Sequence, residues 1–137
     1  FFLFENNINL ISISKYYETP SWPNPKNPKF INIVLKARYA KGPIELLKLC
    51  KLIEYKMGRV KGPKNSPRKC DIDIIDFNGE ITNDKLILPH KMMHKRNFVL
   101  FPLFEIEKRW VHPINKAEIK RLIFSLPNND IRSIKQI

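Results

Sequence analysis

The chain has 137 residues, 43% of them hydrophobic, which is enough for one domain with a core. No apolar run reaches membrane-spanning length, and two cysteines are too few for a disulfide framework or a cysteine-based metal site, so we expect a reducing cytosol and no membrane partner. The net charge of +12 predicts a polyanionic partner, unless the lysines reflect compositional bias alone.

The first third of the chain has the pattern of two strands separated by a loop. Residues 7–17 alternate loosely and predict a first strand. Residues 18–28 hold four prolines, which excludes a helix or a central strand. Residues 30–39 alternate cleanly, with Phe30 and Asn32 on one face, so we expect one strand that pairs with the first.

Three helices are predicted further along. The first opens at Gly42-Pro43, runs to about Met57 and stops at Gly58. Its buried stripe is predicted to be Leu46, Leu49, Cys50, Ile53 and Met57. A basic loop, residues 59–69, follows it.

The second helix is predicted over residues 97–107, with Pro102 in its first turn or at a kink. The third is predicted over residues 116–126, where Asn115 and Glu118 resemble a capping box. We expect the residues after it to form a frayed tail.

The stretch between the first two helices carries the candidate chemistry. Residues 71–77 predict a short strand closed by the turn pair Asn78-Gly79, and residues 80–88 predict short strands or a loop. On a strand, Asp71 and Asp73 share a face, roughly 7 Å apart at their Cα atoms. Paired carboxylates with only oxygen donors favour Mg²⁺ or another hard divalent ion.

The residues alone leave several functions open. An Asp-x-Asp pair on an exposed face is often merely solvated. With a metal, the pair fits phosphoryl-type transfer, because Arg59, Arg68 and Arg96 can grip phosphate oxygens. The charge also permits a basic nucleic-acid-binding module without catalytic activity, and the acids permit a metal-dependent nuclease.

Three blocks, in order and spacing, resemble a known family. They are Ser66-Pro-Arg-x-x-Asp-x-Asp-Ile74, Leu88-Pro-His90 and Lys95-Arg-Asn-Phe-Val-Leu-x-Pro-Leu-x-Glu-Ile106. The chain resembles the 6-hydroxymethyl-7,8-dihydropterin pyrophosphokinases of folate biosynthesis. The resemblance implies an α+β fold, a ferredoxin-like antiparallel sheet with helices packed on it, in a single pyrophosphokinase domain over residues 1–137. We expect a cytoplasmic monomer.

The resemblance also implies an activity and its residues. The family transfers the β,γ-diphosphate of ATP to the hydroxymethyl group of the dihydropterin and releases AMP. Asp71 and Asp73 match the ligands of two Mg²⁺ ions and are catalytic together with Arg59 and Arg68. The positions implied to contact ATP are Glu54, Arg59, Lys61, Arg68, Lys85, His90 and Arg96. Those implied to contact the pterin are Thr19, Pro20, Phe30, Asn32 and Phe98. No nucleic-acid partner is implied.

The front of the chain departs from the family pattern. The family begins with a central strand carrying Gly-Ser-Asn and then a helix, and this sequence has neither; Phe1 to Glu5 resembles the end of a helix. We therefore expect a chain incomplete at its N-terminus, with a gap in the sheet and an exposed apolar edge.

Overall fold

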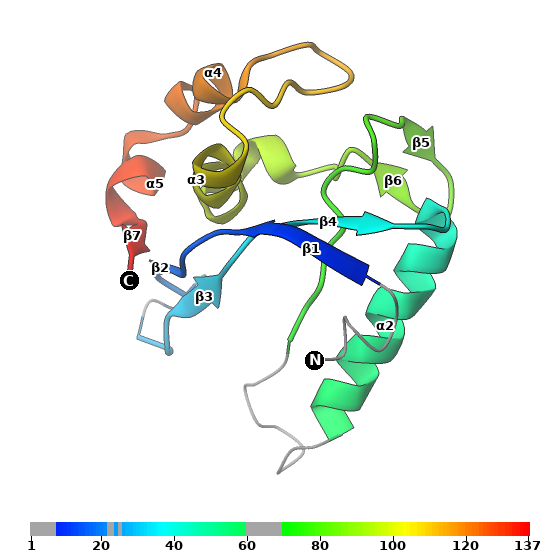
Figure 1. Ribbon diagram of the computed structural model, residues 1–137. Helices are drawn as coiled ribbons and strands as arrows, with labels where there is room; N and C mark the ends of the chain where they lie inside the picture. Colours follow the sequence, from blue (N-terminus) through cyan, green and yellow to red (C-terminus); the bar gives the residue numbers. More distant parts are fainter. Residues whose placement is uncertain (1–7, 22–23, 25, 60–69) are drawn as a thin grey trace. The chain divides into compact units, whose positions relative to one another are not determined.

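The structure is a computed structural model that describes residues 8–21, 24, 26–59 and 70–137, without the side chain of Arg59 (Figure 1). The chain divides into two compact units. Unit 1 comprises residues 1–9 and 38–90, and unit 2 comprises residues 10–37 and 91–137. Strands β1 (Ile8–Ile13) and β4 (Leu35–Tyr39) pair as a two-stranded sheet, and the boundary between the units passes through both strands.

Helix α2 (Pro43–Arg59) is the main element of unit 1. Its first backbone bond runs from the Leu46 N–H to the Gly42 carbonyl, as the Gly-Pro start predicts. Buried Leu49 and Ile53 pack with Ile8, and partly buried hydrophobic side chains surround this core, namely Tyr39, Leu46 and Ile72.

Two predictions about α2 are wrong. Met57 is 41% exposed, so the buried stripe ends one turn earlier than predicted. The helix also continues through Gly58 to Arg59. A glycine within a helix costs only about 1 kcal/mol relative to alanine, which hydrogen bonds to neighbouring turns can offset.

The predicted strand at residues 71–77 is not a strand, because residues 70–76 carry no regular secondary structure. The Ile72 N–H donates to a side chain, Oε2 of Glu54, rather than to a neighbouring strand. The Ile75 carbonyl accepts the N–H of His90 at 2.9 Å. These bonds hold the stretch without giving it the repeated pairing of a ladder.

The turn after this stretch forms as predicted. Asn78 and Gly79 have φ values of 54° and 71°, and the Glu80 N–H donates to the Phe77 carbonyl at 2.9 Å. Positive φ at both central residues is the signature of a type I′ turn. Beyond it, β5 (Thr82–Asn83) and β6 (Ile87–Leu88) form an antiparallel hairpin, which confirms short strands there.

Unit 2 holds a three-stranded antiparallel sheet in the order β3-β2-β7. Its strands are β3 (Phe30–Asn32), β2 (Tyr17–Thr19) and β7 (Lys135–Gln136). The predicted single strand over residues 30–39 is therefore two strands. The break lies at Val34, whose N–H donates to Oγ of Ser14 at 2.9 Å while its carbonyl accepts the Ser14 N–H.

The helices of unit 2 are α3 (Asn97–Ile106), α4 (Ile119–Phe124) and α5 (Asn128–Ser133), after a short 3₁₀ turn at Met93–Lys95. Helices α3 and α4 pack side by side (Figure 1). Pro102 lies inside α3 and is buried, as are Val99, Leu100 and Leu103. The second predicted helix is thus confirmed to within one residue.

The C-terminal predictions need correction. The last predicted helix is shorter, because Glu118 is the N-cap residue of α4 and Asn115 instead accepts the Ala117 N–H at 2.9 Å. No side-chain capping bond forms at Glu118. The expected frayed tail contains α5 and β7, and β7 pairs with β2 so that Gln136 lies opposite Tyr17.

The fold class is therefore mixed, with helices and antiparallel sheets, as the sequence predicts. The described strands fall into three small sheets. Within the described part of the chain, no helix is both long and apolar enough to cross a membrane.

Candidate active site

The acidic stretch of unit 1 presents its two predicted ligands outward. Asp71 and Asp73 are exposed, and Ile72 between them is partly buried against the core around Leu49 and Ile53. The two carboxylates therefore lie on the solvent side, although the stretch is not in a sheet.

Glu54 of α2 connects the helix to this stretch. Its Oε2 atom accepts the N–H of Ile72 at 2.6 Å, and its Oε1 atom lies 3.5 Å from Nζ of Lys51. The side chain of Glu54 is 20% exposed. Sequence spacing contains no signal for this bond, since the two residues are 18 positions apart and in different elements.

Two thiols lie near these acids. Burial raises the pKa of Cys50, and the carboxylates of Glu54 and Asp73 raise it further, against a lowering by Lys51. Burial, Glu54 and Asp71 raise the pKa of Cys70. Both cysteines are free, and at neutral pH both remain thiols rather than thiolates.

His90 is brought to the same place. Its Nε2 atom lies 3.9 Å from Oδ2 of Asp73, and its backbone N–H is held by Ile75. The imidazole is 20% exposed and the Asp73 side chain 52% exposed. His90 follows a cis Leu88–Pro89 bond at the end of β6. When protonated, the imidazole is a cation beside an acid that faces solvent.

The other predicted ATP-contacting residues are distributed unevenly. Lys85 is exposed in the loop between β5 and β6. Lys61 and Arg68 lie outside the described residues, as does the side chain of Arg59. Arg96, the last of the predicted phosphate-contacting cations, belongs to unit 2.

Among the described residues, no group of three or more His, Cys, Asp or Glu side chains could enclose a metal ion. Asp71 and Asp73 nevertheless fit Mg²⁺, which commonly uses one or two carboxylates and completes its six ligands with water and substrate phosphates. Binding of Mg²⁺ therefore does not require that all six ligands come from the protein.

Three predicted pterin-contacting residues share one face of the sheet in unit 2. In the β2–β3 pair, Thr19 lies opposite Phe30 and Tyr17 lies opposite Asn32. Directly opposite and alternate residues point to the same face of an antiparallel pair. The Phe30 ring is 48% exposed, whereas Thr19 is buried. Pro20 is exposed just after β2.

Arg96 and Phe98 lie together at the start of α3. The guanidinium carbon of Arg96 is 5.4 Å from the centre of the Phe98 ring, a cation–π distance. Phe98 is partly buried. The structure therefore brings a predicted phosphate ligand and a predicted stacking ring next to each other.

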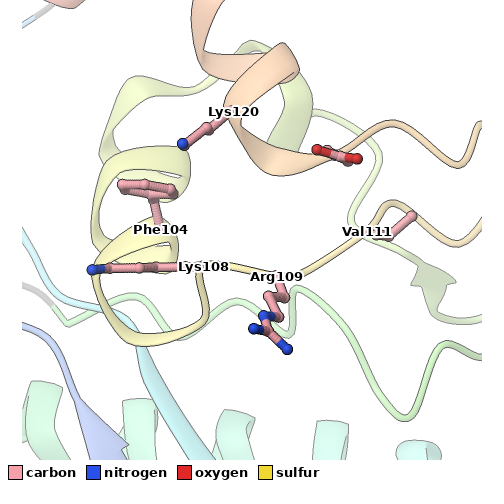
Figure 2. A pocket seen from close by; sticks show the side chains of 6 residues that line it. Phe104, Lys108, Arg109, Val111 and Lys120 are labelled. Atoms are coloured by element: carbon pink, nitrogen blue, oxygen red, sulfur yellow. The ribbon is translucent and has the colours of Figure 1, made fainter.

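Unit 2 also has a surface hollow of about 460 Å³ that contains no predicted site residue. Phe104, Lys108 and Lys120 extend toward the same side of it, and Arg109 points away from them (Figure 2). Its other lining residues are Val111 and Glu118. Three cations around one carboxylate make the hollow positive, in keeping with the charge of the whole chain.

Carboxylates that can hold a hard metal ion, together with cationic side chains, are the groups that enzymes acting on nucleotide phosphates use. The sequence matches the 7,8-dihydro-6-hydroxymethylpterin-pyrophosphokinase (HPPK) family over residues 2–108. The chain belongs to this family.

Curated relatives carry the corresponding name. A 2-amino-4-hydroxy-6-hydroxymethyldihydropteridine pyrophosphokinase of Aquifex aeolicus is 38% identical over 117 residues, which is 85% of this chain and 73% of the relative. The enzyme of that name in Haemophilus influenzae is 35% identical over 119 residues, 86% of this chain and 74% of the relative. A folic acid synthesis protein of Dictyostelium discoideum is 40% identical over 118 residues, 85% of this chain but only 18% of its own length.

Proposed function

We propose that this protein transfers the β,γ-diphosphate of ATP to the hydroxymethyl group of 6-hydroxymethyl-7,8-dihydropterin, in folate biosynthesis. The observation that carries the proposal is the outward-facing pair Asp71 and Asp73 with His90 3.9 Å from Asp73, in a chain of the HPPK family. The family's own name supports the pterin and the diphosphate as the reacting groups.

Asp71 and Asp73 would hold two Mg²⁺ ions. The ions, when bound, neutralise phosphate charge and polarise the phosphorus that is attacked. The chain's cations add to this neutralisation. His90 and Lys85 in unit 1, and Arg96 in unit 2, are assigned to the ATP phosphates, together with Arg59, Lys61 and Arg68. A guanidinium binds two phosphate oxygens at once, and a lysine supplies a point charge.

The bond changes are those of an in-line displacement. The hydroxymethyl oxygen forms a bond to the β-phosphorus of ATP, and the bond between that phosphorus and the oxygen bridging to the α-phosphate breaks. AMP leaves with the electron pair on that oxygen, and the hydroxyl proton passes to solvent water. Such transfer needs little covalent help from a protein, so positioning and charge supply the acceleration.

Unit 2 is assigned to the pterin. A flat, polar heterocycle is selected by aromatic faces and by an amide that pairs with its edge. Phe30 and Phe98 are assigned to stacking and Asn32 to the edge, with Thr19 and Pro20 beside the ring. The shared face of Thr19, Phe30 and Asn32 in the β2–β3 pair supports this assignment.

The family resemblance also implies an architecture, an oligomeric state and a cellular compartment. We propose a single domain with a ferredoxin-like sheet, active as a monomer in the cytoplasm. The antiparallel pairing in the described sheets and the free cysteines support these expectations. The alternative of a nucleic-acid-binding module has no support from the relatives, whose names are those of folate enzymes.

The test is AMP formation from ATP and the hydroxymethyl-dihydropterin in the presence of Mg²⁺. Asp73→Ala should lower the rate roughly a hundredfold or more, because the charge stabilisation supplied through such a ligand is worth several kcal/mol. Asp84→Ala is the matched control, since Asp84 is an exposed acid in the β5–β6 loop of the same unit. If wild-type protein forms no AMP, or Asp73→Ala is as fast as Asp84→Ala, the proposal fails.

A further inference from the structure

We infer that Glu54 is a positioning residue that sets the direction in which Asp71 and Asp73 face, and that it does so through the backbone N–H of Ile72. This inference rests on the proposed function for its catalytic consequence. It changes the role that the family resemblance implies for Glu54, from a direct contact with the nucleotide to a support for the acids.

The carboxylate of Glu54 is already engaged within the protein. Oε2 accepts the Ile72 N–H at 2.6 Å, a short bond of the charge-assisted kind, and Oε1 lies 3.5 Å from the Lys51 ammonium. The side chain is only 20% exposed. A nucleotide contact would have to compete with both partners, and displacing the carboxylate would leave the partly buried Ile72 N–H without an acceptor, at a cost of about 1 to 3 kcal/mol.

Ile72 is the residue whose orientation decides where the acids point. It stands between Asp71 and Asp73 in the chain, and it is partly buried whereas both acids are exposed. The Ile72 side chain packs against the core of Ile8, Leu49 and Ile53, and its N–H is held by Glu54. Side chain and backbone are therefore both anchored to the elements of unit 1, which leaves the two acids on the solvent side.

This anchor matters because residues 70–76 carry no regular secondary structure. In a sheet, a ladder of backbone bonds would prevent rotation about the chain axis. Among the described residues, Glu54 accepts the Ile72 N–H and the Ile75 carbonyl accepts the His90 N–H near the far end of the stretch. The side chain of Asp76 also accepts the Gly79 N–H at 3.2 Å. Groups that orient metal ligands in this way commonly change metal affinity ten- to a hundredfold when they are removed.

The variants that test the inference are Glu54→Ala and Glu54→Gln, with Glu45→Ala as control. Gln keeps an acceptor oxygen for the Ile72 N–H but loses the charge, so it should rescue part of the loss. Glu45 is an exposed acid in the first turn of the same helix. The first readout is amide hydrogen exchange at Ile72 without metal or nucleotide. Exchange should be about tenfold faster or more in Glu54→Ala and unchanged in Glu45→Ala.

The second readout is calorimetric binding of a non-hydrolysable ATP analogue with and without Mg²⁺. If Glu54 positions the acids, Glu54→Ala weakens binding about tenfold with Mg²⁺ and leaves metal-free binding unchanged. A direct nucleotide contact predicts equal weakening in both conditions, and that result would overturn the inference. So would unchanged exchange at Ile72.

The third readout separates this inference from the proposed function. In the AMP assay, Glu54→Ala should raise the Mg²⁺ concentration needed for half-maximal rate about tenfold, with a smaller fall in kcat at saturating Mg²⁺. If wild-type protein forms no AMP, the proposed function fails while the exchange and calorimetric results still decide the role of Glu54. If Glu54→Ala does not fold, Glu54→Gln carries the same three comparisons.

Discussion

At the scale of single residues, the pterin assignment depends most on Phe30, because its ring is 48% exposed on the face that it shares with Thr19 and Asn32. Phe30→Ala should raise the KM for the pterin roughly tenfold, because the pterin loses one of its two stacking rings. The KM for ATP should be unchanged, because Phe30 is assigned to no contact with ATP. Steady-state kinetics with each substrate varied in turn measures both.

The control for that substitution is Phe124→Ala. Phe124 is 80% exposed on α4 of the same unit and is assigned to no ligand. If both variants change the pterin KM equally, or if Phe30→Ala changes the ATP KM instead, the stacking role of Phe30 is wrong.

Tyr17 provides a prediction about alkaline pH. Burial, and then the hydrogen bond and charge of Glu105, raise the pKa of Tyr17 from 10.0 to about 12. Its hydroxyl donates to Oε1 of Glu105 at 2.7 Å. A pKa raised on folding means that ionising the phenol costs more free energy in the folded state than in the unfolded state, so the contribution to stability depends on the phenol staying neutral. This contribution is fully present below pH 10 and is lost as the pH rises through about 12.

Unfolding by urea should therefore show a stability that declines between pH 10 and pH 12 in the wild type. Tyr17→Phe should be less stable at neutral pH and should show a weaker decline over that interval. Tyr16→Phe is the control, because Tyr16 is 56% exposed. The same alkaline decline in Tyr17→Phe as in the wild type would mean that another group causes it.

At the scale of elements, we expect substitution by alanine to have opposite effects on stability at two glycines of unit 1. Gly79 has φ +71° in the turn after the acidic stretch, with nothing within 4 Å of an added Cβ. Gly79→Ala should destabilise the protein by about 1 kcal/mol through backbone strain alone. Gly58 lies in α2, also with open space around an added Cβ, and Gly58→Ala should stabilise by about 0.5 to 1 kcal/mol.

Denaturant unfolding of the two variants beside the wild type measures both effects. The pair is informative because neither added Cβ comes within 4 Å of a described residue, so conformational preference is what separates the two substitutions. A Gly79→Ala variant as stable as the wild type would show that the Asn78-Gly79 turn does not keep positive φ in solution.

At the scale of the whole molecule, binding of the proposed ligands, ATP and Mg²⁺, should raise the free energy of unfolding. A non-hydrolysable ATP analogue with Mg²⁺, at a hundred times its Kd, should stabilise the folded chain by about 2.7 kcal/mol and raise Tm by roughly 8 °C. Without Mg²⁺ the rise should be much smaller, because the acids would then repel the phosphates. Thermal unfolding with and without EDTA tests this, and an equal shift in Asp73→Ala would contradict the metal assignment.

The net charge of +12 acts at the same scale. It favours an anionic nucleotide through the summed field, which salt screens, whereas the oriented acids require the metal. Added salt should weaken binding of the analogue without abolishing its dependence on Mg²⁺, and the calorimetric titration repeated at two ionic strengths separates these contributions.

Local chemistry made several features of this protein predictable from sequence. The Gly-Pro start of α2, the positive φ values of Asn78 and Gly79, the shared face of Phe30 and Asn32, and α3 all follow from steric and periodic rules within a few residues. The family was predictable too, because three short blocks in order carry it, and the match over residues 2–108 confirms it.

Other features were set by contacts between distant segments. The Val34 break arises from bonds with Ser14, 20 residues away, and the C-terminal strand forms because β2 offers it an edge. The acidic stretch is not a strand, although its composition is that of one, and its Ile72 N–H bonds to a glutamate 18 residues earlier.

The identity and order of the chemical groups follow from the sequence alone: the two acids, the histidine, the rings and the cations, together with the turns and helices that need only near neighbours. How the acids are held depends on tertiary contacts. Their orientation comes from a hydrogen bond and a core contact that join a helix to an irregular stretch, and such long-range pairing leaves no periodic trace in the chain.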